Sequence, residues 1–201
     1  MNAGQTCVAP DYVLVHRDVK AAFMQKLLAT LKHFYGEDPR QSESYCRIIN
    51  ARHHARLASL LRGGAHGGAV VAGGLDGGGS DAGDARGPYL APTVVDDPDP
   101  SSDLMQSEIF GPILPVVTVA SADEAVAFVN ARARPLALYV FAADADAEAV
   151  VARTVSGGAC VNDTIFQISN PHLPFGGVGG SGMGPFIHAE RNTPHSRNAL
   201  A

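Results

Sequence analysis

The stretch NAGQTCVAP, residues 2–10, places a cysteine where it could act as a nucleophile. Cys7 follows Gly4, Gln5 and Thr6, which are small or polar. The backbone amides of such a turn can stabilise a thiolate, and a thiolate attacks carbonyl carbon to form a covalent intermediate. An unperturbed thiol, with a pKa of about 8.5, is only slightly ionised at neutral pH and needs a nearby base or positive potential. A buried structural cysteine is the alternative, and the local pattern leaves both interpretations open.

The other residues that could do chemistry give weaker signals. Cys46 and Cys160 complete an odd set of three widely spaced cysteines, which favours neither a disulfide framework nor a CxxC zinc site. We interpret both as structural. Among eight histidines, His53 and His54 are adjacent, whereas two metal ligands on a helix need a spacing of three or four residues. The sequence therefore predicts no metal site.

A glycine-rich motif near the end of the chain resembles a nucleotide-binding fingerprint. GVGGSG, residues 177–182, fits the pattern G-x-G-x-x-G. That fingerprint requires a following helix, a second strand and an acidic residue about 20 positions on, and only 19 residues follow. We interpret the motif as a tight glycine loop that does not hold a nucleotide.

Length and composition indicate one soluble globular domain. The chain has 201 residues, 46% hydrophobic and 17% charged, with a net charge of −5 and scattered basic residues. No basic stripe for nucleic acid is present. No apolar run approaches the roughly 20 residues of a membrane span, and the first residues lack the layout of a signal peptide. We therefore predict a cytoplasmic protein that binds neither nucleic acid nor membrane.

The elements that must position these residues alternate along the chain. Apolar runs with strand character predict strands at 12–16, 69–73, 114–120, 136–142 and 158–163. Helical periodicity and capping residues predict helices capped by Asp18, over 51–62, from a Ser121–Glu124 capping box to about Ala131, and from Asp144 to about Thr154. In the first helix, Phe23, Leu27, Leu31 and Phe34 should share one face.

This alternation predicts an α/β fold with a mainly parallel sheet and helices on both faces, because parallel strands need crossover connections. One segment interrupts the pattern. Residues 73–87 contain many glycines and few apolar groups, and we expect an exposed, flexible loop there.

Several blocks, in order, resemble the signature sequences of the aldehyde dehydrogenase family. They are NAGQTC with APDYVLV, then YLAPTVV, QSEIFGPILPV, VNDT and LPFGGVGGSGMG. Together they cover residues 1 to about 185 and are most similar to the branch that acts on fatty and aromatic aldehydes, which includes coniferyl aldehyde dehydrogenases. The resemblance implies an NAD- or NADP-dependent oxidoreductase that converts an aldehyde to a carboxylic acid.

The resemblance also implies site residues. Cys7 matches the family's nucleophile, which forms a thiohemiacetal and then a thioester. Glu108 matches the glutamate that accepts hydrogen bonds from the nicotinamide ribose, and Phe110 matches the aromatic residue beside the nicotinamide. Without that context, these two residues would read as a surface glutamate and a core phenylalanine. Asn162 and the 174–182 loop resemble positions that line the family's active-site region, where we expect backbone support.

Parts of the family pattern are not matched. The family's cofactor domain, the asparagine that helps to stabilise the oxyanion and the general-base glutamate all precede the nucleophile. We therefore expect residues 1–185 to form a partial catalytic domain, the carboxyl-terminal piece of a longer enzyme, followed by a divergent tail at 186–201. Alone, such a piece should be inactive.

Association is the corresponding expectation for partners. Apolar surface that would meet a cofactor domain favours a homo-oligomer or pairing with a full-length homologue. Two alternatives stay open: a non-catalytic fragment that pairs with full-length subunits, and a cofactor-free thiol esterase that uses Cys7.

Overall fold

The computed structural model describes residues 2–76 and 78–184. The chain divides into two compact units, residues 1–120 and 121–201. Each is an α/β arrangement, as the sequence predicts, and each is described by itself below. No helix among the described residues is both long and apolar enough to cross a membrane.

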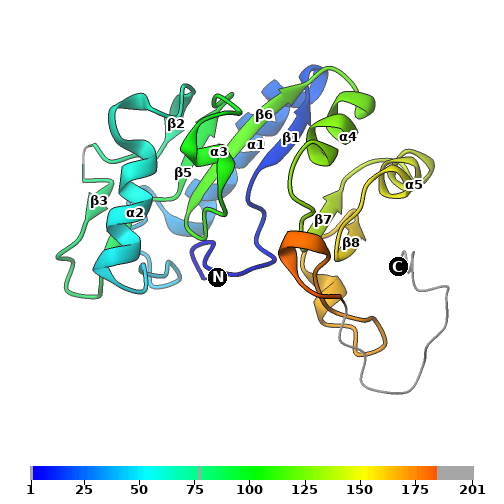
Figure 1. Ribbon diagram of the computed structural model, residues 1–201. Helices are drawn as coiled ribbons and strands as arrows, with labels where there is room; N and C mark the ends of the chain where they lie inside the picture. The colour runs from blue at the N-terminus through cyan, green and yellow to red at the C-terminus, as the bar shows by residue number, and fades with distance from the viewer. Residues whose placement is uncertain (1, 77, 185–201) are drawn as a thin grey trace. The chain divides into compact units, whose positions relative to one another are not determined.

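The first unit is built on a four-stranded sheet in the order β1-β6-β5-β2 (Figure 1). Its strands are β1 (Val13–His16), β6 (Ile113–Val119), β5 (Thr93–Asp96) and β2 (Ala69–Ala72). β6 runs parallel to both β1 and β5, whereas β2 is an antiparallel edge strand on β5. The mainly parallel sheet that the sequence predicts is confirmed.

Helices cover both faces of this sheet. Val94 and Val116 face α1 (Arg17–Tyr35), whose apolar side chains pack on them. Val95 and Ile113 point to the opposite face, into a core that includes side chains of α2 (Ala51–Leu61) and α3 (Asp103–Gln106). Figure 1 shows α1 on one side and α2 and α3 on the other. The alternation along each strand therefore serves two separate cores.

The glycine-rich segment 73–87 contains structure that its composition does not suggest. Ser80–Asp81 forms β3 and pairs antiparallel with β4 (Tyr89–Leu90). The Arg40 guanidinium binds the Gly78 carbonyl oxygen at 2.7 Å and the Asp81 carboxylate at 3.2 Å. Arg47 reaches Asp84 at 3.2 Å. Arginines from outside the segment thus fasten it, and a propensity argument confined to the segment does not detect them.

The second unit contains α4 (Ala122–Asn130), β7 (Ala137–Val140), α5 (Asp144–Arg153) and β8 (Gly158–Val161). β7 and β8 form a parallel pair. Two short 3-10 turns follow, η2 (Phe166–Ile168) and η3 (Gly179–Ser181). GVGGSG therefore ends in a tight turn, as expected. The tail predicted at 186–201 lies outside the described residues.

Three local predictions need correction. Asp18 lies in the first turn of α1, and the cap is His16, whose Nδ1 accepts from the Asp18 amide at 3.3 Å. Asp144 is the first residue of α5 and does not cap it. Phe34 is 62% exposed near the end of α1, because Tyr35 takes the inward position there and packs against the cluster that contains Tyr45 and Tyr89. The Ser121 cap of α4 is confirmed, with Oγ accepting from the Glu124 amide.

Candidate active site

Cys7 lies on a compact loop, residues 2–9, which we call the Cys7 loop. Two turns shape it: the Gln5 amide donates to the Asn2 carbonyl at 3.1 Å, and the Ala9 amide donates to the Thr6 carbonyl at 2.9 Å. The Cys7 side chain is exposed, whereas the neighbouring Val8 is 1% exposed. The loop therefore anchors its backbone beside the thiol and leaves the thiol accessible, which argues against a buried structural cysteine.

The Cys7 loop packs closely against a second segment that the sequence singles out. Ala3 and Gly4 both adopt the left-handed backbone conformation, with φ of 51° and 72°. A Cβ atom at Gly4 would collide with the carbonyl group of Gly111. Glycine is required here both for its backbone conformation and for this close approach. The contact fixes the loop against the residues that follow Phe110.

The 108–110 segment is held through its central residue. Ile109 is 2% exposed and belongs to the core between the sheet and α2. Its amide donates to the Asp11 carboxylate at 2.8 Å, and its carbonyl oxygen accepts from the Arg56 guanidinium. Both backbone polar groups of Ile109 are thus satisfied by charged side chains, which form the stronger class of hydrogen bond. We call Asp11 and Arg56 the Ile109 clamp.

The residues on either side of Ile109 are exposed. Glu108 presents its carboxylate to solvent, and the Phe110 side chain is 40% exposed. Phe110 also has a φ of 50°, which is uncommon for an aromatic residue. The core reading of Phe110 is therefore excluded. The buried side chain of Ile109 thus anchors the backbone from which both exposed side chains extend.

Burial dominates the electrostatics of the clamp. It raises the pKa of the Asp11 carboxyl above its ordinary value of 3.8, and the nearby Glu108 raises it further. The Ile109 amide and the Arg56 charge act in the opposite direction but do not overcome the loss of solvation. The clamp therefore holds Ile109 at some electrostatic cost.

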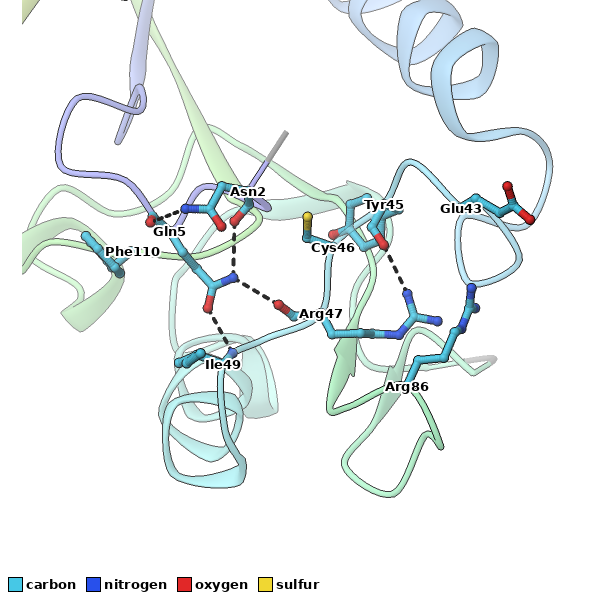
Figure 2. Close-up of a pocket in the computed structure, with 9 residues that line it drawn as sticks. All are labelled: Asn2, Gln5, Glu43, Tyr45, Cys46, Arg47, Ile49, Arg86 and Phe110. Atoms are coloured by element: carbon cyan, nitrogen blue, oxygen red, sulfur yellow. Dashed lines mark hydrogen bonds between the residues drawn. The ribbon is translucent and has the colours of Figure 1, made fainter.

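A cavity of about 580 Å³ lies beside these two segments (Figure 2). Asn2 and Gln5 of the Cys7 loop line it together with Phe110. The rest of its wall comes from Glu43, Tyr45, Cys46, Arg47, Ile49 and Arg86. Cys46 is exposed, so the interpretation of Cys46 as a buried structural cysteine is wrong. Neither Cys7 nor Glu108 lines this cavity, so it brings the Cys7 loop and Phe110 together without the Cys7 thiol or the Glu108 carboxylate.

Arg47 contributes a charged but heavily paired wall to the cavity. Its side chain is 9% exposed, and it donates to the Arg40 carbonyl and the Asp84 carboxylate. Its guanidinium also lies over the ring of Tyr89, with Arg40 similarly placed. These contacts assign Arg47 to holding the 73–87 segment in place.

In the second unit, Asn162 supports the backbone as expected. Its φ is 57°, and its side-chain amide pairs with both backbone groups of Ala142, at 3.1 and 3.0 Å. This pairing ties the turn after β8 to the turn after β7. Cys160 is partly buried within β8, and burial raises its thiol pKa, which suits a structural cysteine.

The match to known proteins settles the family. The sequence model of the family described as "Aldehyde dehydrogenase family" matches residues 1–195 of the chain. The chain belongs to the aldehyde dehydrogenase family. The resemblance drawn from the signature blocks is confirmed, and the α/β architecture of this aldehyde dehydrogenase chain is that of its relatives.

Two relatives show the extent of the similarity. The chain is 48% identical over 206 residues to mouse "Aldehyde dehydrogenase, dimeric NADP-preferring", covering 100% of this chain and 42% of the relative. It is 48% identical over 186 residues to "4,4'-diaponeurosporen-aldehyde dehydrogenase" of Staphylococcus aureus, covering 92% of this chain and 39% of that protein. The chain thus spans about two fifths of the length of these relatives.

Solved structures agree with the sequence relatives. The substrate-bound state of Staphylococcus aureus AldH matches with a TM-score of 0.82 and 48% identity, covering 92% of this chain and 38% of that one. An NAD-dependent aldehyde dehydrogenase from Sinorhizobium meliloti matches with a TM-score of 0.79 and 31% identity, covering 92% and 36%. The fold is therefore shared well beyond the most similar sequences.

Proposed function

We propose that this chain forms the nucleophile-bearing part of an enzyme that oxidises an aldehyde to a carboxylic acid with NAD or NADP. One observation carries the proposal. A chain of this family exposes the thiol of Cys7 on a loop that packs, through Gly4 and Gly111, against the segment carrying Glu108 and Phe110. The nucleophile and the residues proposed for the cofactor are thereby built as one piece.

The chemistry assigned to Cys7 is covalent catalysis. The thiolate attacks the aldehyde carbon to form a thiohemiacetal, the carbon loses a hydride to become a thioester, and water releases the acid. NAD or NADP, when bound, accepts that hydride. The Cys7 loop contributes an exposed sulfur and a fixed backbone beside it, which reduces the entropy lost when the substrate is attacked.

The exposed pair around Ile109 fits the nicotinamide end of the cofactor. A carboxylate such as Glu108 accepts hydrogen bonds from neighbouring ribose hydroxyls, and a flat aromatic face such as that of Phe110 supports a planar ring. The clamp on Ile109 keeps both side chains outward. Both therefore hold and orient the cofactor and take no part in bond breaking.

The proposal is tested in a chimera. The chain is fused in register to the amino-terminal part of the Staphylococcus aureus relative, with which it shares 48% identity. NADH and NADPH formation is then followed with aromatic and long-chain aldehydes. We expect turnover in the chimera, and little or none in the chain alone, since the chain spans about two fifths of its relatives' length.

Two cysteine variants of the chimera test whether Cys7 is the nucleophile. Cys7→Ala should lower turnover by about a thousandfold or more, as loss of a covalent nucleophile does. Cys46→Ala is the matched control, since Cys46 is also exposed, and it should leave the rate within about twofold because nucleophilic catalysis does not use it. Turnover that persists in a folded Cys7→Ala chimera would contradict the assignment of Cys7 as the nucleophile.

A further inference from the structure

The side chain of Gln5 links the Cys7 loop to a segment more than forty residues away (Figure 2). Its Nε2 donates to the Asn2 carbonyl at 3.1 Å and to the Arg47 carbonyl at 3.0 Å. Its Oε1 accepts from the Ile49 amide at 3.0 Å. Both amide protons and the carbonyl oxygen of one side chain are thus engaged by backbone groups.

These partners fix the orientation of the Gln5 amide. A backbone amide can only donate and a carbonyl can only accept, so the Ile49 contact must be to oxygen and the other two to nitrogen. The contacts on either side of Ile48 have the pattern by which a neighbouring strand would pair with that residue. Gln5 therefore replaces a strand partner at this point.

The far end of the link is rigid. Ile48 is 2% exposed and belongs to the same core as Ile109. Its amide donates to the Pro88 carbonyl at 2.9 Å. A side chain fastened to this backbone is fastened to the core of the first unit, which is the least mobile part of a folded domain.

At the near end, the Cys7 loop is anchored by the buried side chains of Ala3 and Val8, and hydrogen bonds add to this anchoring. Ala3 and Gly4 hold left-handed conformations, which for Ala3 is strained and persists only where the surroundings impose it. Inside the loop, Asn2 Nδ2 donates to the Gln5 carbonyl and to Thr6 Oγ1, contacts that do not reach the core. The Gln5 side chain supplies the hydrogen bonds from this loop to the Arg47–Ile49 backbone.

We infer that Gln5 is a positioning residue for Cys7: its side-chain amide holds the Cys7 loop in the conformation that acyl chemistry at the sulfur requires. The inference rests on the proposed role of Cys7 as nucleophile. Attack on a carbonyl builds charge on its oxygen, which backbone amides beside the sulfur stabilise only where they are held in place. Alkylation at a saturated carbon builds no such charge.

Two reactions of the purified chain separate these cases. In the first, the Cys7 sulfur bonds to the acetyl carbon of p-nitrophenyl acetate, the bond to p-nitrophenolate breaks, and the thiol proton passes to solvent. In the second, iodoacetamide alkylates the cysteines, and peptide mass spectrometry resolves Cys7, Cys46 and Cys160. Neither reaction needs a cofactor or an aldehyde.

Gln5→Met and Gln5→Glu remove the donors at nearly constant length. We expect the acylation rate of Cys7 to fall about tenfold in both, while its alkylation rate stays within about twofold, because misplacement affects the reaction that needs oriented groups. Amide hydrogen exchange at position 5 and at Ala9 should become faster in both variants, and exchange at Ile49 should become faster in Gln5→Met, which also loses the acceptor oxygen. Gln106→Met is the control, since the Gln106 amide also donates to a backbone carbonyl, that of Pro100, and it should change none of these values.

The outcomes separate three cases. Unchanged acylation in both Gln5 variants, with acylation lost in Cys7→Ala, would overturn the positioning role and leave the nucleophile assignment standing. A parallel change in acylation, alkylation, Cys160 labelling and the urea midpoint would show a general structural role and would also overturn it. Acylation that persists in Cys7→Ala would overturn the nucleophile assignment, and the role of Gln5 with it.

Discussion

The Cys7 loop and the 108–110 segment are held in place by different kinds of interaction. The loop relies on neutral groups: a glutamine amide, two turns and a glycine contact. The 108–110 segment relies on the charges of Asp11 and Arg56 and on a buried isoleucine. Both are anchored to one core, through Ile48 and Ile109. Two segments can therefore be anchored to the same core and still respond differently to pH and substitution.

The largest effect is expected where the two segments touch. Gly4→Ala must place a Cβ against the Gly111 carbonyl and hold alanine at a φ of 72°. Overpacking and the left-handed conformation together should lower the free energy of unfolding by about 2 to 4 kcal/mol. Urea denaturation measures the loss.

Gly63→Ala separates the two contributions. Gly63 has a φ of 63° and a ψ of 13°, in the left-handed region, and a Cβ there would meet no atom within 4 Å. This control should show only the conformational part, about 1 to 2 kcal/mol. Equal losses in the two variants would mean that the contact between the segments carries no energy, and the proposed shared placement of Cys7 and Phe110 would lose its basis.

The charged clamp gives the next effect. Arg56→Met keeps much of the side-chain volume but leaves the Ile109 carbonyl oxygen without this donor. Hydrogen bonds to charged groups contribute about 1.5 to 3 kcal/mol, and we expect an unfolding free energy lower by that amount. Thermal or urea denaturation under identical buffer conditions checks it.

An exposed arginine provides the comparison for Arg56. Arg153 pairs with Asp123 at 2.6 Å, but the two side chains are 50% and 79% exposed. Arg153→Met should cost less than about 1 kcal/mol because solvent screens such pairs. If Arg56→Met cost no more than this control, the clamp would be an ordinary surface contact, and Glu108 and Phe110 would owe their placement to Ile109 alone.

The sequence was a good guide to the fold because hydrophobic periodicity reports burial. The apolar run at 114–120 corresponds to β6, and the Ser121 signal marks the start of α4. β5 is not predicted as a strand, because its apolar run is only Val94 and Val95 between Thr93 and Asp96 and is too short to show a periodicity. The sequence does not predict β3, because pairing with β4 and contacts from Arg40 and Arg47 stabilise it, and these residues are remote in sequence.

The candidate site was predictable only in part. Cys7, Glu108 and Phe110 came from residue types and family blocks, and their exposure agrees with their proposed roles. The sequence does not indicate which residues hold these three in place. Gln5 and Asp11 act on backbone groups 42 and 98 positions away, and a backbone group leaves no signal in the residue types. Supporting contacts of this kind become visible only in three dimensions.

The smallest effect, and the one most specific to the clamp, is its response to pH. Because burial raises the pKa of Asp11 in the folded chain, the folded state keeps this proton over a range above 3.8 in which the unfolded state has released it. Stability from this group therefore falls as pH rises through that range. Asp11→Asn does not ionise, and its side-chain oxygen can still accept from the Ile109 amide, so the variant should gain stability relative to wild type across the same range.

Asp99→Asn supplies a control of opposite sign. Hydrogen bonds from the Ser101 amide and hydroxyl lower the pKa of Asp99, so its contribution is present above 3.8 and is lost as pH falls through the folded value. Relative to wild type, this variant should lose stability as pH rises through the window below 3.8. Urea titrations at several pH values measure both differences. A flat difference for Asp11→Asn, beside the expected slope for Asp99→Asn, would mean that the clamp carries no buried charge, and the contrast with the neutral Cys7 loop would disappear.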